Sequence, residues 1–319
     1  MTTINLKWTD QQNPMWSDYH SSSTLTMPIY DHLKPDSKVF AMGSCFAVEI
    51  RMALARAGID VYPKYKEIPI DHEHYIIGGL PERDNINYYH TFAIRQEFER
   101  FHGIWKQQSD DYWSISDRFW KQPSAVIYQD PYRRTVLGKS PEELFQAIDL
   151  LTECTFEGMR QADIFLITLG LIEVWRKKNN GLFTCEYPGY NLGGGFNETE
   201  FHLSSFQENY ENLKATVGLI KEINPNAKIV FTVSPVALGR TFTDTDVVIA
   251  NTESKCLLRT AAAQVVREEE DVFYFNSFEI ANALGRDTYK PETGRHVKED
   301  VVFAITRTFM QSHSAGRVG

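Results

Sequence analysis

The stretch that decides the fold is Val39-Phe40-Ala41-Met42-Gly43-Ser44-Cys45-Phe46-Ala47-Val48-Glu49-Ile50. It begins as an apolar run typical of a buried strand, breaks at Gly43, and continues as an amphipathic segment that reaches Ala57. Because glycine has no Cβ, it lets the backbone turn sharply from strand to helix. The turn leaves Ser44 and Cys45 at the carboxyl end of a strand and beside a helix N-terminus. Open α/β sheets bind ligands there, and the helix dipole lowers the pKa of a thiol. An ordinary tight turn with a buried cysteine is the competing interpretation.

The bulk composition is that of a globular protein. The chain has 319 residues, of which 42% are hydrophobic and 24% charged, enough for one large domain with insertions or a domain with a subdomain. The net charge of −9 and the pI near 5.5 argue against a nucleic-acid partner. No apolar run approaches the roughly 18 residues of a membrane span, and residues 1–20 lack the pattern of a signal peptide. The sequence therefore predicts a cytoplasmic protein.

The cysteines agree with that prediction. They are widely spaced and form no CxxC pair, which indicates reduced thiols rather than a disulfide framework or a zinc site. The four are Cys45, Cys154, Cys185 and Cys256.

Three segments differ in pattern from the rest of the chain. Residues 1–36 are polar and proline-containing, and we expect an N-terminal arm that Trp8 and Trp16 pin to the body. Residues 37–313 form the domain, and 314–319 a flexible tail. Within the domain, residues 63–139 are rich in aromatic and turn residues, a composition that favours an insertion acting as a lid or substrate wall.

The remaining pattern alternates strands with helices. Ser140 as N-cap and Pro141 at the first helical position mark one helix start. Three of the strands are apolar on both faces, which predicts a mostly parallel five-stranded sheet between two layers of helices. We expect strands over residues 38–42, 59–62, 163–168, 228–233 and 272–275. We expect helices over residues 47–57, 94–102, 141–161, 203–223, 245–269 and 297–312, with a loop over 179–197.

Polar or glycine clusters follow four of these strands. Because the carboxyl ends of parallel strands meet at one edge of a sheet, the clusters should converge. A thiol or hydroxyl is a weak nucleophile until a neighbouring imidazole takes its proton, and His296, in a glycine-containing loop before the last helix, is best placed to do so. A solvated histidine near a helix start is the alternative. The clusters are Gly43-Ser44-Cys45, Gly170-Leu171-Ile172-Glu173, Ser234-Pro235 and Asn276-Ser277-Phe278-Glu279.

Gly43-Ser44-Cys45-Phe46-Ala47 resembles the motif that gives the GSCFA domain family its name. The resemblance extends over about residues 36–305. It implies kinship with the SGNH/GDSL hydrolases, hence a flavodoxin-like three-layer α/β/α sandwich and an esterase, deacetylase or acetyltransferase activity. The companion motifs are Ile94-Arg95-Gln96-Glu97-Phe98-Glu99, Thr168-Leu169-Gly170-Leu171-Ile172-Glu173-Val174-Trp175, Phe231-Thr232-Val233-Ser234-Pro235-Val236 and the strand end from Tyr274 to Glu279.

Laid on the hydrolase motif, the corner puts Cys45 at the position of the nucleophilic serine and Ser44 at that of the aspartate. The resemblance thus favours Cys45 as nucleophile, with Ser44 as competitor. It also favours the backbone N–H of Cys45 and the Gly170 turn as oxyanion donors. Ile172 stands where the group has an asparagine donor, so that part of the oxyanion hole departs from the pattern.

The final motif of the group, Asp-x-x-His, matches His296, but Thr293 occupies the aspartate position and Glu292 precedes it. The acid that orients the imidazole is thus absent or displaced, and Glu292, Glu279 or Glu173 could replace it. A Cys–His pair tolerates this loss better than a Ser–His pair, because a thiolate–imidazolium pair needs less help.

Weaker signals complete the candidate site. Gly43, Gly170, Glu173, Ser234 and Glu279 are candidates for oxyanion or substrate binding by position. Arg95 and Gln96 could line the pocket wall, although surface ion pairing is the more ordinary reading of Arg95. Asp71-His72-Glu73-His74 looks like a metal cluster, but its spacing favours a solvated loop, so no metal and no cofactor are expected.

Two functions remain in view. The first is acyl transfer or ester hydrolysis on an acylated carbohydrate or similar small polar substrate, with Cys45 or Ser44 attacking and His296 moving the proton. The second is a catalytically lapsed scaffold that binds a glycan or small ligand, because the missing asparagine and displaced acid are what lost chemistry would leave.

Overall fold

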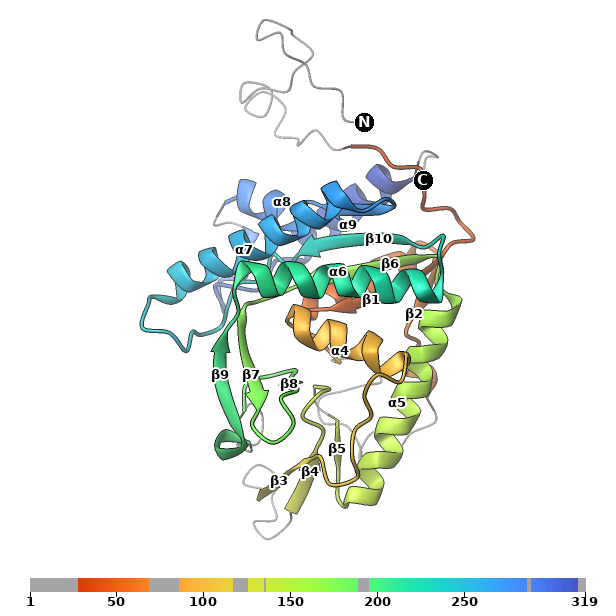
Figure 1. Ribbon diagram of the computed structural model, residues 1–319. Helices are drawn as coiled ribbons and strands as arrows, with labels where there is room; N and C mark the ends of the chain where they lie inside the picture. Colours follow the sequence, from red (N-terminus) through yellow and green to blue (C-terminus); the bar gives the residue numbers. More distant parts are fainter. Residues whose placement is uncertain are drawn as a thin grey trace, which may run out of the picture.

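The computed structural model describes residues 28–68, 86–116, 126–134, 136–188, 195–285 and 288–314. At its centre is a five-stranded sheet, parallel throughout, in the order β11-β10-β6-β1-β2 (Figure 1). Counted along the chain, this is the 2-1-3-4-5 order of flavodoxin-like sheets, so the predicted fold class is confirmed. The strands are β1 (Lys38–Gly43), β2 (Asp60–Tyr62), β6 (Ile164–Leu169), β10 (Lys228–Val233) and β11 (Val272–Phe275).

Helices cover both faces of this sheet. Side chains alternate along β1, so that Phe40 and Met42 join one apolar core while Val39 and Ala41 join the other. The first core is shared with α4 (Thr91–Phe101), α5 (Pro141–Gln161), α6 (Phe206–Ile223) and α7 (Val247–Glu268). The second is shared with α2 (Cys45–Arg56), α8 (Ser277–Ala283) and α9 (Glu299–His313). The result is the three-layer sandwich in which α4 and α6 lie in front of the sheet in Figure 1.

Two small antiparallel sheets extend below the sandwich in Figure 1. One consists of β8 (Phe183–Thr184), β7 (Glu173–Lys177) and β9 (Thr199–Leu203), the other of β3 (Trp113–Ser116), β4 (Val126–Gln129) and β5 (Leu137–Gly138). Short 3₁₀ turns lie at η1 (Tyr65–Glu67) and η2 (Phe196–Glu198). The prediction of a plain loop over 179–197 was wrong at β8, because two-residue strands carry no periodic signal.

Capping residues, rather than the apolar pattern, set several of the helix ends. α5 begins at Pro141 with Ser140 as N-cap, as predicted, and Gly58 follows α2 with φ +83°. α2 begins at Cys45, two residues earlier than predicted, and α4 begins at Thr91 because His90 caps it. α8 was missed, since a seven-residue helix is too short to show a period.

The described chain begins beside the end of α9 (Figure 1). Tyr30 and His32 pack their rings against Phe273 of β11 and His313 of α9, at centroid distances from 4.7 to 5.3 Å. This contact ties residues 28–33 to the body. The domain boundaries remain predictions, and the expected anchors Trp8 and Trp16 lie outside the described residues.

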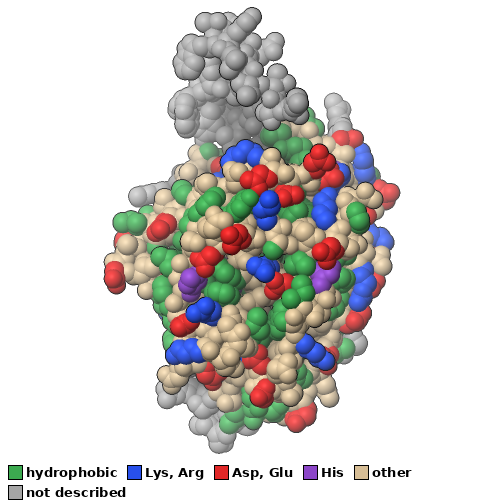
Figure 2. Space-filling view, viewed as in Figure 1, with side chains coloured by type: hydrophobic (Ala, Val, Ile, Leu, Met, Phe, Trp, Pro, Cys, Tyr) green, Lys and Arg blue, Asp and Glu red, His purple; other side chains and the backbone are tan. Residues whose placement is uncertain are grey.

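Surface charges are mixed. Acidic and basic side chains are interspersed on the face that Figure 2 shows, without a basic stripe there. None of the described helices combines the length and hydrophobicity that a membrane span requires. All four cysteines are free thiols.

His90 makes the fold sensitive to acid. Its Nδ1 accepts a hydrogen bond from the Ala93 N–H and its Nε2 faces the Thr184 carbonyl at 2.8 Å, so the ring is held neutral with its proton on Nε2. Burial lowers the pKa of His90 to about 4, against about 6.5 in the unfolded chain. Between these values the unfolded state binds the extra proton, so stability falls as the pH drops.

We expect this one residue to contribute a loss of about 1.4 kcal/mol per pH unit as the pH falls from 6 to about 4. His90→Asn keeps an N-cap oxygen and removes the titration. Urea unfolding of both proteins at a series of pH values should therefore give a shallower pH dependence for the variant. Parallel curves would contradict the assignment.

Candidate functional site

Cys45 lies at the turn between β1 and α2, at the point where the strand order reverses. Gly43 has φ +126°, and a Cβ there would lie 2.1 Å from the Thr168 carbonyl oxygen on β6. The Ser44 N–H donates to that same oxygen at 3.0 Å. Glycine is required for this approach of the two strand ends, and the turn delivers Cys45 as the first residue of α2. The Ala47 N–H of this first turn already donates to the Ser44 carbonyl at 2.8 Å. The N–H groups of Cys45 and Phe46 have no intrahelical acceptor, so they are available to an anion.

Two cavities adjoin at this corner, with volumes of about 550 and 360 Å³. Cys45, Arg134 and His296 line both of them. The larger one falls in the size range of small-molecule sites, about 300–1,000 Å³. The loop that carries His296 thus returns to the corner that carries Cys45, and the two side chains border the same space.

Ser44, the competing nucleophile, points elsewhere. It is 2% exposed, its hydroxyl lies 3.0 Å from the Thr168 hydroxyl, and it lines neither cavity. Cys45 is half-buried and borders both. Of the two, the position of Cys45 is the one that suits attack on a bound molecule.

The loop before α9 is held in a hairpin-like form. Tyr289 and Val297 form an antiparallel bridge, and the Lys290 N–H donates to the His296 carbonyl at 2.8 Å. Gly294, with φ +65°, makes the reversal between them. These backbone contacts hold the loop in which His296 lines the two cavities.

The three acids proposed to orient His296 lie in different places. Glu292 is exposed at the loop tip and lines neither cavity. Glu279, on α8, binds the Arg259 guanidinium at 2.5 Å and the Tyr274 hydroxyl at 3.0 Å. Glu173 borders the larger cavity, where its carboxylate accepts bonds from the Thr241 hydroxyl and the Phe242 N–H, both at 2.7 Å. Only Glu173 of the three shares a cavity with His296.

The Gly170 turn is fixed by its own hydrogen bonds. The N–H groups of Gly170 and Leu171 both donate to the Tyr89 carbonyl, at 3.0 and 3.1 Å. A Cβ on Gly170 would lie 2.6 Å from that oxygen, so the glycine permits the contact. Both N–H groups are thus engaged within the protein in this structure, and the role of Gly170 as an oxyanion donor stays a prediction.

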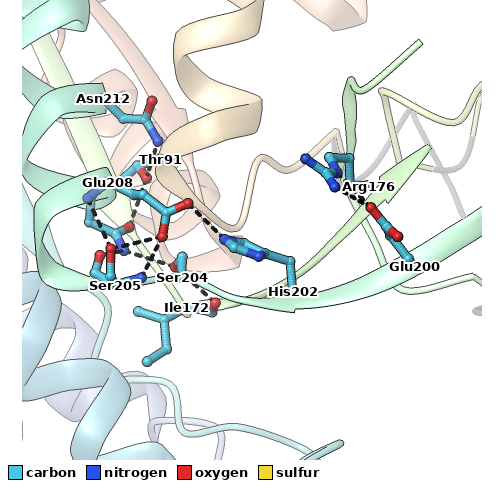
Figure 3. Close-up of polar contacts among 10 residues, drawn as sticks. Thr91, Ile172, Arg176, Glu200, His202, Ser204, Ser205, Glu208 and Asn212 are labelled. Atoms are coloured by element: carbon cyan, nitrogen blue, oxygen red, sulfur yellow. Dashed lines mark hydrogen bonds and ion pairs between the residues drawn. The ribbon is translucent and has the colours of Figure 1, made fainter. Parts of the chain in front are cut away.

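Polar contacts from β9 and α6 anchor the next residue of this turn (Figure 3). The Ser204 N–H and hydroxyl both donate to the Ile172 carbonyl, at 3.0 and 2.9 Å, and the Asn209 amide donates to the Ser204 hydroxyl at 2.8 Å. Figure 3 also shows the contact between His202 of β9 and Glu208 of α6, whose Nε2 and Oε1 atoms lie 2.8 Å apart. Ile172 is therefore held through its backbone carbonyl, while its buried side chain supplies no hydrogen-bond donor.

The remaining predicted residues support the site from outside. Ser234 accepts the Val236 N–H at 3.2 Å, and Arg95 pairs with Glu99 at 2.6 Å. Gln96 exchanges two 2.8 Å hydrogen bonds with the backbone of Phe183, which fixes β8. None of these three side chains lines the two cavities.

No metal centre forms within the described part of the chain. No three His, Cys, Asp or Glu side chains there are grouped to bind an ion. The sequence 71–74, considered above as a metal cluster, lies outside the described residues.

The wall of the larger cavity is aromatic. Trp175 of β7 and Tyr187, just after β8, both pack against Phe242, at centroid distances of 5.4 and 5.0 Å. Strands β7 and β8 thus carry part of the wall, together with the residues that follow β8 and the loop that carries Phe242. The prediction had placed a substrate wall in residues 63–139, of which Tyr89, His90 and Arg134 line this cavity.

Opposing effects act on the Cys45 thiol. Burial raises the pKa of Cys45, while the charges of Lys255, Arg295 and Arg134, in that order, lower it; Glu49 raises it slightly further. Burial lowers the pKa of Lys255 to about 7. Lys255 is 1% exposed and donates to the Gly170 carbonyl at 2.8 Å. The Lys255 amine is therefore buried at the end of β6, close enough to Cys45 for its charge to lower the pKa of the thiol.

A second buried pair borders the cavity. Arg134 Nε and Glu186 Oε1 lie 2.6 Å apart, and both side chains line the wall. Burial raises the pKa of Glu186 to about 7, against the attraction of Arg134. Glu186 can therefore change protonation near neutral pH.

Sequence reasoning missed Lys255, Arg134 and Glu186. Lys255 had a signal, because it falls on the apolar face of its helix, next to Ser254 and one turn before Leu258, both fully buried. Arg134 and Glu186 had none, since their meeting depends on pairing between distant loops.

Lys255→Met separates the charge of this residue from its bulk. Without the ammonium, the pKa of Cys45 should rise, so alkylation by iodoacetamide should shift to higher pH. The loss of this buried amine, whose pKa burial lowers, should also remove a cost of folding that grows as the pH falls below about 10. Lys214→Met, which removes an exposed lysine 3.1 Å from Glu268, is the control. An unchanged pH profile for Cys45 would show that Lys255 has no influence on it.

The family profile described as "GSCFA family" matches residues 38–309. The chain belongs to the GSCFA family. The match extends from β1 into α9, so Cys45 and His296 both lie within the family region of this GSCFA protein. No curated protein sequence matches the chain. Among solved structures, the "Clostridium thermocellum family 3 carbohydrate esterase" is similar, with 11% identity, a TM-score of 0.31, and coverage of 90% of this chain and 92% of that one.

Proposed function

We propose that this GSCFA-family protein is an acyl hydrolase or acyltransferase with Cys45 as nucleophile and His296 as proton carrier. The observation that carries the proposal is that both side chains line the same cavity, with Cys45 heading α2. A thiol at a helix N-terminus and an imidazole on the same cavity are the two elements that covalent acyl transfer requires.

In the proposed reaction the Cys45 sulfur attacks the acyl carbonyl carbon while His296 accepts the thiol proton. The carbonyl oxygen becomes an oxyanion, which the N–H groups of the first α2 turn can bind. Collapse breaks the bond to the leaving oxygen or nitrogen, which takes the proton from the imidazolium. Water or a second hydroxyl then attacks the thioester, with His296 as base, and restores the thiol.

The cavity wall favours a ring-shaped polar substrate. Trp175, Tyr187 and Phe242 offer aromatic surface, and Glu173 and Glu186 add polar groups beside it. Sugar rings bind against such surfaces through their apolar faces while their hydroxyls bond to polar neighbours. We therefore propose an acylated carbohydrate or a similar small polar ester or amide.

The test is turnover of chromogenic acetyl esters and of O- and N-acetylated sugars by the wild type, Cys45→Ala and His296→Ala. The proposal predicts turnover by the wild type and its loss in both variants. Turnover that neither substitution lowers would end the assignment.

A binding module without chemistry is the second candidate. This candidate is favoured by the burial of Cys45, which raises the pKa of the thiol and so disfavours the reactive thiolate. This reading predicts that an acetylated sugar binds equally well to the wild type and to Cys45→Ala, and that neither protein turns it over.

A further inference from the structure

Among the described residues, two arginines of the larger cavity pair with no carboxylate. They are Arg295 and Arg240, which both line the cavity. Each touches neutral groups instead. Arg295 donates to the Ala237 carbonyl at 3.2 Å, and the Arg240 guanidinium lies over the Tyr187 ring at 5.4 Å.

The two acids of the same cavity are already engaged. The carboxylate of Glu173 binds the Thr241 hydroxyl and the Phe242 N–H, and Glu186 pairs with Arg134. Burial keeps the pKa of Glu186 near 7, so part of its negative charge is neutralised at physiological pH. Three arginines (Arg134, Arg240 and Arg295) line the cavity against these two acids, so its charge is positive although the whole chain carries a net charge of −9.

Packing against the backbone fixes the position of Arg295. Its guanidinium lies against the backbone at Gly239, where a Cβ would sit 3.3 Å from the guanidinium carbon. It directly precedes His296 in the loop, and its charge acts on the Cys45 sulfur. Arg240 and Arg295 thus face the same space as the nucleophile, from two different loops.

We propose that Arg295 and Arg240 form an anion subsite beside Cys45, so that the preferred acyl substrate carries a carboxylate or a phosphate group close to its acyl bond. That the bound anion is an acyl substrate rests on the proposed function. Anion binding itself requires only the cavity and its two arginines. A planar guanidinium binds carboxylate and phosphate oxygens through paired N–H donors, which gives direction as well as charge. With the aromatic wall, this favours a ring with an acidic substituent, such as a sugar acid or a sugar phosphate.

A pair of alkylating reagents tests the charge without any turnover. Iodoacetate and iodoacetamide have nearly the same shape, and each forms a bond between the thiolate sulfur and its methylene carbon as iodide leaves. They differ by one negative charge, so the ratio of their rates at Cys45 reports the local potential and cancels the thiol's own ionisation. Peptide mass spectrometry resolves the sites, and exposed Cys256 on α7 is an internal reference in the same molecule.

We expect the iodoacetate-to-iodoacetamide rate ratio to be higher at Cys45 than at Cys256, and to fall about tenfold in the double variant Arg240→Met/Arg295→Met. Added salt should also lower the ratio at Cys45. Arg176→Met is the matched control, because Arg176 lies on β7 but pairs with Glu200 and lines neither cavity. Equal ratios at the two cysteines, or a ratio that the double variant leaves unchanged, would overturn the subsite.

Protection from iodoacetamide identifies the anion. D-glucuronate, D-glucose 6-phosphate and D-glucose are compared as protectants of Cys45 in the wild type and the double variant. Better protection by either acid than by glucose, lost in the double variant, supports the subsite and shows whether carboxylate or phosphate fits. Equal protection by all three sugars would overturn it.

The two proposals fail separately. Charge-selective alkylation without ester turnover would leave the subsite and reject the enzyme. If neutral and acidic esters turn over at equal rates, and the iodoacetate-to-iodoacetamide ratios at Cys45 and Cys256 are equal, the enzyme is supported and the anion subsite is rejected.

Discussion

Replacing Cys45 with alanine is expected to lower kcat for acyl-ester turnover by at least about 10³-fold, because the acyl group then has no thiol to accept it. The cavity keeps its wall, so KM should change far less than kcat. Rates with a chromogenic acetyl ester over a range of concentrations separate the two constants.

Two single substitutions are the controls for this loss. Ser44→Ala removes the buried hydroxyl that bonds to Thr168, and Cys256→Ala removes an exposed thiol. Both variants should retain kcat within a few-fold of the wild type. If Ser44→Ala instead loses turnover while Cys45→Ala keeps it, the choice of nucleophile made here is wrong.

Gly43→Ala is expected to have the largest effect on stability. Its Cβ would lie 2.1 Å from the Thr168 carbonyl oxygen and 2.7 Å from the Thr168 nitrogen, at a backbone φ of +126° that L-residues avoid. Both atoms belong to the backbone of β6 at the centre of the sheet, so they cannot move aside. We expect a loss of about 4 kcal/mol or more, which for a chain of this length corresponds to a fall in Tm of roughly 6 °C or more.

Gly218→Ala is the matched control. Gly218 lies in α6, and a Cβ there would meet no atom within 4 Å. Alanine is favoured over glycine inside a helix by about 1 kcal/mol, so Tm should rise slightly. Thermal unfolding followed by circular dichroism checks both. Equal melting temperatures for Gly43→Ala and the wild type would show that Gly43 does not pack tightly against the Thr168 backbone.

The sandwich was predictable from the sequence because its strands are fully buried. The ranges 228–233 and 272–275 coincide with β10 and β11, since each is an apolar run bounded by polar or turn residues. The helix from Pro141 was predictable because Ser140 and Pro141 form a start signal that does not depend on tertiary contacts.

The small sheet β8-β7-β9 was not predictable. β7 follows the buried run of β6 after only a short turn, so that residues 164–175 look like one apolar stretch. Its partner β9 begins at Thr199, and β8 has only two residues. Pairing across such separations leaves no local pattern. The aromatic wall of the cavity was missed for the same reason.

Within the site, the residues close to the motif could be found and their partners could not. The register of the GSCFA motif pointed to Cys45, and the loop position pointed to His296. Burial of Ser44 against Thr168 distinguishes the two candidate nucleophiles, and that contact joins residues 124 positions apart. Lys255 reaches the corner from α7 by a contact across 85 positions. Such contacts are fixed by the packing of the sheet and its helices.

The central claim is that the Cys45 sulfur becomes acylated, and a trapped intermediate tests it most directly. The wild type is mixed with a chromogenic acetyl ester, quenched with acid within the first turnovers, and digested for peptide mass spectrometry. The account predicts one added acetyl group, removable by hydroxylamine as thioesters are, on the peptide that contains Cys45, and none there in Cys45→Ala. Turnover that leaves Cys45 unmodified, with the acyl group on Ser44 or on no residue, would contradict it.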